Sequence, residues 1–420
     1  MNVAILGVGT VGSEVANVLV QNSELIKARA GVEIKPVIGV VRDMKRKREC
    51  QIPLTDDIES VINRDDIDVY VELMGGVEKP FEIVKKILAR KKPVVTANKA
   101  LLAYHRYKLE ALAGTTPIGF EASVAGGIPI IRALRDGLSA NSIQKITGIL
   151  NGTSNFILTN MMKKGVSFGD ALKKAQELGY AEADPTFDIG GFDAAHKLLI
   201  LASIAFSIHG DPEDILIEGI EEISKEDIYF ANDFEYVIKL LAVAKRVGEK
   251  VELRVHPALV SKDQIIARVD GVMNGVAING DAMSESMFYG PGAGGKATAS
   301  AVISDLIDVA RDIKKPMLGY KLPIIEPLTL QDIDKIRTKY YLRLKVADEL
   351  GVLAKITNIM SQNNLSIDSF LQKPHTADEP IPTLFFTTHT SLEKDVKRVM
   401  GILEKQDFIK AKPFMIRIEG

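Results

Sequence analysis

Short hydrophobic runs and longer amphipathic stretches alternate through the first part of the chain. The hydrophobic runs predict buried strands, at residues 3–6, 33–41, 68–74, 93–96 and 117–121. Between them, apolar residues recur with the three- to four-residue spacing of a helix that packs on a sheet, as at 79–90. Strands that alternate with helices in this way are typical of an α/β domain with a parallel sheet.

The alternation stops beyond residue 130. A strand is predicted at 143–150, and a strongly apolar helix is predicted to begin near Phe192. Further on, the pattern predicts one helix at 234–247 and strands at 251–260, 264–269 and 271–280. We interpret this region as an inserted α+β domain that binds substrate.

A second change of pattern follows the inserted domain. The glycine-rich turn GPGAGG, at 290–295, precedes a long helix at 297–311, so the chain is predicted to return to the first domain. A flexible loop without a ligand is the alternative. The last block of the chain follows the order βαββαβ of a ferredoxin-like fold. The predicted domains are 1–128 plus 290–313, 129–289 and 339–420, with a linker at 314–338 that contains Pro316, Pro323 and Pro327.

The first strand leads into a glycine-rich turn, GVGTVG, and then into a helix. Gly7 permits the tight turn, Gly9 lets the backbone approach a pyrophosphate, and Gly12 lets the helix pack closely on the strand. The N–H groups at the start of the helix are free to bind phosphate. The motif predicts a Rossmann fold that binds a dinucleotide, and a plain strand–turn–helix unit is the alternative.

The residues after the second strand bear on the choice of dinucleotide. Arg42 and the basic run at 45–48 could accept a 2′-phosphate, which favours NADP. Asp43 leaves NAD possible, because an acidic residue there can bind the 2′-hydroxyl of the ribose. The basic run could equally be a solvated loop.

The most distinctive stretch is GYAEADPTFDIGGFDAAHK, at 179–197. It is rich in carboxylates, glycine and proline, and it runs directly into the apolar helix. Asp193 and Lys197 would lie four residues apart on one helical face. Lys197 would project from the first turn, where the helix dipole and partial burial could lower its pKa toward neutrality and let it exchange a proton. A surface salt bridge is the alternative.

A second lysine follows a predicted strand directly. Lys99 ends the sequence TANK, at 96–99, and so lies at the carboxyl end of a strand, where open α/β sheets bind ligands. It is a candidate for contact with substrate or cofactor. An ordinary surface lysine is the alternative.

Composition narrows the classes of function. Lys and Arg number 53 and Asp and Glu 55, for a net charge of −2, so nothing indicates a nucleic-acid or anionic membrane partner. The chain begins with an apolar strand in place of a cleavable leader, and the apolar run at 198–206 is too short to cross a bilayer. Cys50 is the single cysteine and allows no internal disulfide. We therefore expect a cytoplasmic protein.

Six motifs, in this order and spacing, closely resemble those of homoserine dehydrogenase: GVGTVG, TANK, EASVAGGIP, NGTSNF, GYAEADPTFDIGGFDAAHK and GPGAGG. The last block, with DELGVLAKIT at its first strand–helix junction, is similar to an ACT domain. The resemblance covers nearly the whole chain. It implies reversible reduction of L-aspartate 4-semialdehyde to L-homoserine with NADPH or NADH, in threonine and methionine biosynthesis.

The resemblance also implies roles for individual residues. Lys197 would donate the proton, Lys99 would lie beside it, and Asp193 would position Lys197. Glu182 and Asp188 match the carboxylates that hold the ammonium group of the substrate. Besides Lys99, the matches to cofactor contacts are Thr10, Val11, Gly179 and Gly292.

The segment EASVAGGI matches a monovalent-cation site of the family, with sodium as the usual ion. Its ligands would be the side chain of Glu121 and the backbone carbonyls of Val124, Gly126 and Ile128. Hard oxygen ligands on a turn suit such an ion. The residues by themselves indicate only a turn before a helix.

The ACT resemblance implies amino-acid sensing, with threonine as the expected effector near 348–352, where Gly351 lets the backbone approach a ligand. Dimerisation alone is the alternative role. The family resemblance further implies a homodimer through the inserted domain, or a homotetramer. Two other functions stay open: a dehydrogenase acting on a different amino acid, and a regulatory protein that senses NADPH without turnover.

Overall fold

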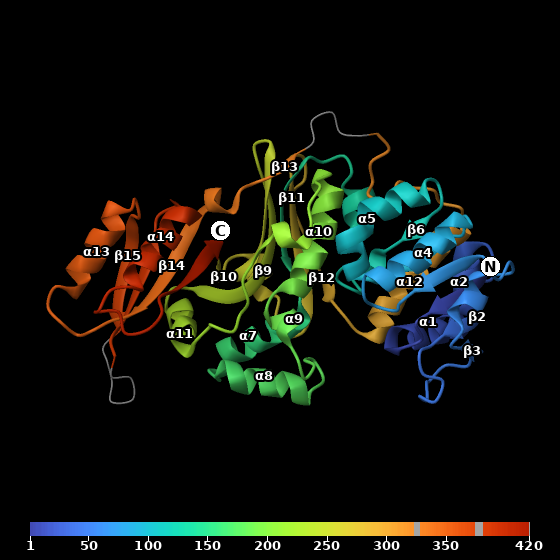
Figure 1. Cartoon of the computed structure of the whole chain (residues 1–420), viewed down its shortest axis with the longest axis horizontal. Coiled ribbons are helices and arrows are strands. Elements are labelled where there is room, and N and C mark those ends of the chain that lie inside the picture. The colour runs from blue at the N-terminus through green and yellow to red at the C-terminus, as the bar shows by residue number, and fades with distance from the viewer. Residues whose placement is uncertain (323–327, 374–380, 420) are drawn as a thin grey trace. The chain divides into compact units, whose positions relative to one another are not determined.

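The computed structural model describes residues 1–322, 328–373 and 381–419 (Figure 1). The chain forms two compact units, each built from three segments. The first unit comprises Met1–Leu150, Asp193–Asp214 and Met273–Thr329, and the second comprises Asn151–Phe192, Ile215–Val272 and Leu330–Gly420. The domain boundaries proposed from the sequence remain predictions.

The first unit contains the predicted parallel sheet. Its six strands follow the order β3-β2-β1-β4-β5-β6. They are β1 (Asn2–Leu6), β2 (Lys35–Val40), β3 (Leu54–Thr55), β4 (Val69–Glu72), β5 (Val94–Thr96) and β6 (Ile118–Gly119). This is the doubly wound order of a Rossmann fold, and its direction reverses between β1 and β4. Ligands of such sheets bind at that point, beyond the carboxyl ends of the strands.

Helices connect these strands and bury their apolar faces against the sheet. They are α1 (Thr10–Gln21), α2 (Ser23–Ala30), α3 (Ile58–Ile62), α4 (Glu78–Ala89) and α5 (Lys99–Ala113). Helix α12 (Gly295–Ala310) joins them from far along the chain, and its Val302 shares a buried core with Leu19 of α1 and Ile5 of β1. The predicted return of the chain to this fold is therefore confirmed.

Three antiparallel strands also belong to the first unit. Their order is β12-β11-β7, with β7 at Ile143–Ile149, β11 at Met273–Gly280 and β12 at Ser284–Pro291. The predicted helix after Pro129 consists of α6 (Ile130–Arg132) and a π-helical turn (Ala133–Gly137). The apolar helix α10 (Phe192–Phe206) begins where the sequence predicts it, and most of its residues are buried.

The second unit contains the predicted ferredoxin-like module, which we define as residues 337–419. Its elements are β14 (Arg337–Lys345), α13 (Val352–Gln362), β15 (Ile367–Lys373), β16 (Thr383–Thr388), β17 (Ser391–Leu392), α14 (Glu393–Leu403) and β18 (Phe414–Glu419). The main strands follow the order β18-β14-β16-β15. This order places the first and last strands of the βαββαβ unit side by side, and a single apolar core lies between the sheet and its two helices.

The module shares its sheet with the rest of the second unit. Strand β18 pairs in parallel with β10 (Lys250–Ser261), and β10 pairs along its length with β9 (Tyr236–Val247). The remaining elements are α7 (Gly152–Lys164), α8 (Phe168–Glu177), α9 (Thr186–Ile189), β8 (Leu216–Ile217) and α11 (Lys225–Asp233). The sheet of the ferredoxin-like module is therefore continuous with the sheet of the rest of the second unit.

Two secondary-structure predictions are wrong. The segment at 234–247, predicted as a helix, is mainly strand β9, and a run of its residues is buried without alternation. A strand covered on both faces loses the two-residue periodicity, so its apolar run looks like that of a buried helix. The segment at 264–269, predicted as a strand, is a 3₁₀ turn (Ile265–Arg268) whose Ile266 and Ala267 are buried.

The linker prediction falls partly outside the described residues. Pro323 and Pro327 lie there, whereas Pro316 lies in the described part. The end of the predicted linker contains β13 (Thr329–Leu330) and a 3₁₀ turn (Ile333–Lys335). Among the residues that the structure describes, no helix combines the length and apolarity needed to cross a membrane.

Candidate active site

A cleft of about 700 Å³ lies at the carboxyl ends of β1, β2 and β4. Its lining joins the glycine-rich turn after β1 to the residues that follow β2 and β4: Gly7, Val8, Gly9, Val40, Val41, Arg42, Asp43, Arg46, Arg48, Asp56, Ile58, Leu73, Met74, Gly75, Lys79 and Pro80. The cleft therefore occupies the crevice where a doubly wound sheet binds a dinucleotide.

The geometry of the three glycines of GVGTVG is compatible with the parts predicted from the sequence. Gly7 has a φ of +106°, and a Cβ there would lie 2.6 Å from the carbonyl oxygen of Leu73. A Cβ on Gly12 would lie 2.4 Å from the carbonyl oxygen of Gly7, so α1 touches the turn directly. A Cβ on Gly9 would meet no atom within 4 Å, which leaves the backbone open to a ligand.

Arginines line the part of the cleft beyond β2. Arg48 is held by the backbone, since its Nε donates to Val8 O at 2.7 Å and its Nη1 to Asp43 O at 2.8 Å. The carboxylate of Asp43 accepts a hydrogen bond from the backbone N–H of Lys45 at 2.8 Å. Arg42 is exposed and lines the cleft. The loop thus presents positive charge, which fits a ligand phosphate.

The two other glycine-rich turns of the first unit lie against each other. A Cβ on Gly126, whose φ is +45°, would lie 2.7 Å from the carbonyl oxygen of Gly292. The N–H of Gly127 donates to Pro291 O at 3.0 Å. Gly292 itself leaves no room for a side chain, because a Cβ there would overlap Asn274. The sequence suggested both turns, but their contact could not be foreseen.

Asp193 lies between the two candidate lysines. Its Oδ1 is 2.5 Å from Lys99 Nζ, and its Oδ2 is 2.7 Å from Lys197 Nζ. Lys197 also donates to Leu150 O at 2.7 Å. Asp193 is 2% exposed and Lys197 8% exposed, so the predicted pairing at i and i+4 is confirmed and is not a surface salt bridge.

The charges of the two lysines keep the carboxyl group of Asp193 ionised. Burial by itself raises the pKa of a carboxyl group, but the charges of Lys197 and Lys99 outweigh burial and hold the pKa of Asp193 well below its usual value. The carboxylate therefore stays ionised between two ammonium groups. Such an arrangement can hold a proton donor in a fixed place beside a reacting oxygen.

Lys99 is held by a network that begins on β4. Glu72 is fully buried, and its carboxylate accepts from Thr96 Oγ1 at 2.6 Å and from the N–H of Met74 at 2.8 Å. Asn98 caps α5 through the N–H of Leu101 and donates to Gly76 O at 2.9 Å. Burial raises the pKa of Glu72.

The place of Glu72 in this network was not predicted from the sequence. The available signal was a carboxylate at the end of a strand that is otherwise apolar.

The predicted substrate carboxylates belong to the second unit. Asp188, in α9, accepts from Asn151 Nδ2 at 2.8 Å, and its backbone carbonyl accepts from Ser154 Oγ at 2.9 Å. Glu182 is exposed. Gly179 ends the turn after α8 with a φ of +73°, a value that favours glycine. Asn151 was noted only as part of a polar motif, and its bond to Asp188 could not be foreseen.

The segment proposed for a cation is a tight turn around a buried carboxylate. Glu121 is 3% exposed, and its two oxygens accept from the N–H groups of Ile131 and Arg132 at 2.9 Å each. Ala125 and Gly126 both have positive φ, so the backbone reverses sharply between Val124 and Ile128. No cluster of three or more acidic, histidine or cysteine side chains suited to a metal occurs in the described part of the chain. The cation site formed by the side chain of Glu121 and the carbonyls of Val124, Gly126 and Ile128 stays a prediction.

Comparisons of this chain with family models, with known proteins and with solved structures all find homoserine dehydrogenases. Family models match as homoserine dehydrogenase (residues 129–307), homoserine dehydrogenase NAD-binding domain (7–118) and ACT domain (340–408). A homoserine dehydrogenase of Helicobacter pylori is 51% identical over 420 residues, which span 100% of this chain and 99% of that protein.

Solved structures of homoserine dehydrogenases also match this chain. The structure of a homoserine dehydrogenase from Thiobacillus denitrificans has a TM-score of 0.92 and 43% sequence identity to this chain, and the match covers 100% of this chain and 98% of that one. A hyperthermophilic archaeal homoserine dehydrogenase in complex with NADPH has a TM-score of 0.62 and 27% identity, covering 73% of this chain and 96% of its own.

The space around Gly12 and Gly9 predicts different effects for the same substitution: a loss of stability at Gly12 and a loss of nucleotide binding at Gly9. Gly12→Ala should lower the thermal unfolding temperature, because the new methyl group meets the carbonyl of Gly7 and overpacking costs about 1–3 kcal/mol. Gly9→Ala should leave that temperature unchanged but weaken binding of NADPH, because its methyl group enters the open cleft. Thermal denaturation and nucleotide titration measure the two effects. Equal losses of stability would contradict this assignment.

Proposed function

The chain belongs to the homoserine dehydrogenase family, and from this premise we propose how its residues divide the reaction between them. The enzyme interconverts L-aspartate 4-semialdehyde and L-homoserine with a nicotinamide cofactor and carries a C-terminal ACT domain. Family membership over the full length disfavours the two other functions, a dehydrogenase of another amino acid and a sensor without turnover. The observation that supports the proposed chemistry is the burial of Asp193 between Lys99 and Lys197.

Reduction of an aldehyde creates negative charge on the carbonyl oxygen, and that oxygen must receive a proton. The nicotinamide supplies or accepts the hydride when it is bound. We assign Lys197 as the proton donor to the oxygen and Lys99 as the second positive charge beside it. Asp193 holds both ammonium groups within ion-pair distance and keeps them from separating. Its ionised state supports this role.

The other end of the substrate is an amino acid and carries an ammonium group. We assign Glu182 and Asp188 to that group, because carboxylates stabilise a buried ammonium by charge-assisted hydrogen bonds. Asn151 would orient Asp188 through the hydrogen bond to its Oδ1.

The cleft beyond β1, β2 and β4 is assigned to the cofactor. Its pyrophosphate would lie at the open face of Gly9 and at the first N–H groups of α1, beside Thr10 and Val11. Lys99, Gly179 and Gly292 are further proposed contacts. Arg42 supports a preference for NADP, because its exposed guanidinium lines the cleft where a 2′-phosphate would extend.

Three further assignments complete the proposal: a cation, an effector and an assembly. Sodium is assigned to the carboxylate of Glu121 and the carbonyls of Val124, Gly126 and Ile128, and the reversed backbone of this turn supports the assignment. Threonine is proposed as the effector near 348–352, where Gly351 precedes α13 with a φ of +87°. A homodimer or homotetramer is the assembly we propose.

The reaction itself is tested by the initial rate of homoserine-dependent reduction of NADP and of NAD, with and without threonine. We expect turnover with both cofactors, a higher kcat/KM with NADP, and a lower rate when threonine is present. An equal rate with and without threonine would contradict the proposal that threonine is the effector. Absence of turnover in protein that binds NADPH would contradict the reaction.

Lys197→Met should lower kcat by roughly 10²–10⁴-fold, the usual contribution of a positioned proton donor. Binding of NADPH should be retained, because the cofactor cleft is lined by other residues. Steady-state kinetics and a fluorescence titration with NADPH separate the two effects. Lys108→Ala is the matched control, since Lys108 is an exposed lysine of α5. A Lys197→Met enzyme with normal kcat would refute the proposed mechanism.

Arg42→Gln should raise the KM for NADP about tenfold or more and leave the KM for NAD unchanged, because only NADP carries the 2′-phosphate. Both constants are measured at saturating homoserine. Lys47→Gln serves as the control, because Lys47 is exposed in the same loop and does not line the cleft. Equal changes in both KM values would show that Arg42 does not read the phosphate.

A further inference from the structure

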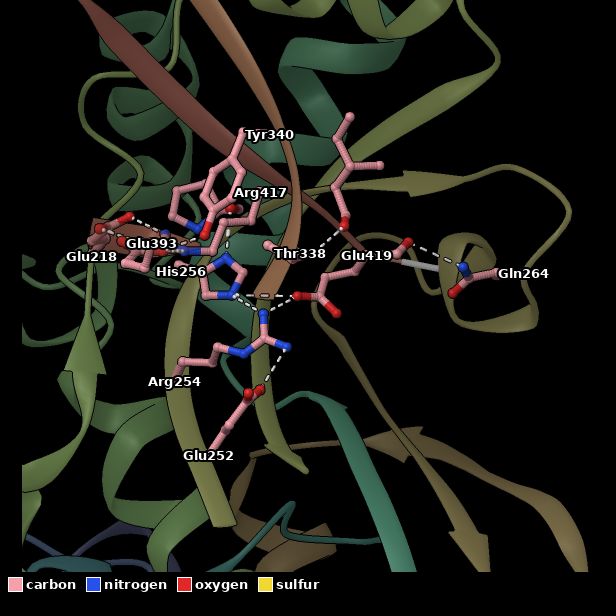
Figure 2. A network of polar contacts seen from close by, with 12 residues as sticks. Glu218, Glu252, Arg254, His256, Gln264, Thr338, Tyr340, Glu393, Arg417 and Glu419 are labelled. Atoms are coloured by element: carbon pink, nitrogen blue, oxygen red, sulfur yellow. Dashed lines mark hydrogen bonds and ion pairs between the residues drawn. The ribbon is translucent and has the colours of Figure 1, made fainter. Parts of the chain in front are cut away.

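A buried arginine of β18 joins two carboxylates from different parts of the second unit. Arg417 is fully buried and donates two parallel hydrogen bonds to Glu218, Nη1 to Oε2 at 2.6 Å and Nη2 to Oε1 at 3.0 Å. Its Nε donates to Glu393 Oε2 at 3.0 Å, and its Nη2 also bonds to Glu393. Figure 2 shows Arg417 beside these carboxylates. Bidentate pairs of this kind fix geometry as well as charge.

The Glu393 side of this link belongs to the ferredoxin-like module. Glu393 is the first residue of α14, and its carboxylate also accepts from the hydroxyl of Tyr340 of β14 at 2.7 Å. Burial opposes ionisation of Glu393, but the charge of Arg417 outweighs burial and lowers the pKa of that carboxyl group. The start of α14 is therefore tied to β18 by a buried ion pair.

Neighbouring residues hold β18 itself in place. Arg417 pairs with Ala258 of β10 in the parallel ladder, and Arg254 of β10 forms an ion pair with Glu419 of β18 (Figure 2). His256 lies between them on β10, and burial holds its pKa well below the usual value. Arg417 thus projects from a strand that is anchored to β10 at Arg417 itself and at the two residues that follow it.

The Glu218 side leads toward the acidic stretch. The N–H of Glu218 donates to Val255 O of β10 at 2.8 Å, and the N–H of Ile220 donates to Ile189 O at 3.0 Å. A Cβ on Gly219 would lie 2.8 Å from that same carbonyl oxygen and 3.0 Å from the Cα of Gly190. The segment at 218–220 therefore lies directly against the residues that follow Asp188.

We propose that Arg417 is a positioning residue for Asp188, acting through Glu218 and the segment at 218–220, and that it ties substrate binding to the ferredoxin-like module. The inference rests on the proposed role of Asp188 in holding the ammonium group of the substrate. Asn151, which caps the start of α7, and Ser154 of α7 fix Asp188, and the Arg417 link fixes the residues just after it. Chains of packed contacts of this kind can carry coupling between distant sites.

Glu218→Gln is the most informative substitution. Glu218 has a side-chain exposure of 33%, whereas Arg417 and Glu393 are fully buried. Loss of the Glu218 charge leaves Arg417 paired with Glu393, so no buried charge remains without a partner. Removal of Arg417 would leave two carboxylates facing each other. The Gln variant therefore weakens the link while the protein keeps its fold.

We expect Glu218→Gln to raise the KM for homoserine roughly three- to tenfold, with kcat and NADP affinity unchanged. The same substitution in an Asp188→Asn background should have no further effect, because Glu218 acts through Asp188. Glu222→Gln, at an exposed position four residues further on, should match the wild type.

Two results would overturn the proposal. One is an unchanged KM in Glu218→Gln, and the other is an equal rise in KM with and without Asp188→Asn. Turnover of homoserine by the wild type is measured first, so failure of the reaction itself is recognised separately. Arg417→Lys provides a second variant that keeps the charge, and it should raise the same KM, because an ammonium group cannot form the paired bonds of a guanidinium.

Discussion

The ion pairs of Asp193 are the constraint on which the proposed catalytic site of the first unit depends. An ionised carboxylate that is 2% exposed destabilises a protein strongly unless it is paired. Asp193 meets this condition through one lysine at the start of α5 and another in the first turns of α10. Lysine at a helix N-terminus is unfavourable by itself, because the helix dipole is positive there. The shared carboxylate offsets that cost and brings two helices, distant in sequence, to one point.

The same logic extends outward from the lysines. Lys99 begins α5 immediately after Asn98, and Asn98 is held through Gly76 and through Thr96, which bonds to Glu72. The loop after β4, which lines the proposed cofactor cleft, and the start of α5, which carries Lys99, are therefore fixed by one hydrogen-bond network. Because Glu72 is fully buried, the network has little freedom to rearrange, and fully satisfied networks of this kind make a site rigid.

Local patterns account for what the sequence could predict. The glycine turn, the parallel sheet, the ferredoxin-like order and the pairing of Asp193 with Lys197 all depend on residues close together in the chain. The contact of Lys99 with Asp193 and that of Arg417 with Glu218 join residues far apart, and no spacing rule reports such pairs. The failure at 234–247 has a different cause: burial of both faces removes the alternation by which a strand is recognised. Family resemblance supplied roles for single residues but not the bonds that hold them.

The shared sheet of the second unit has a consequence for how the chain could be shortened. Strand β10 pairs with β18 at Ala258, Leu259 and Val260, all of which are buried. A chain cut before the ferredoxin-like module would leave this apolar stretch as an edge strand with free N–H and carbonyl groups. Such edges recruit strands from other molecules, so the truncated protein would tend to aggregate unless the new edge were covered or given charged residues. The module therefore also serves as a cap for the sheet.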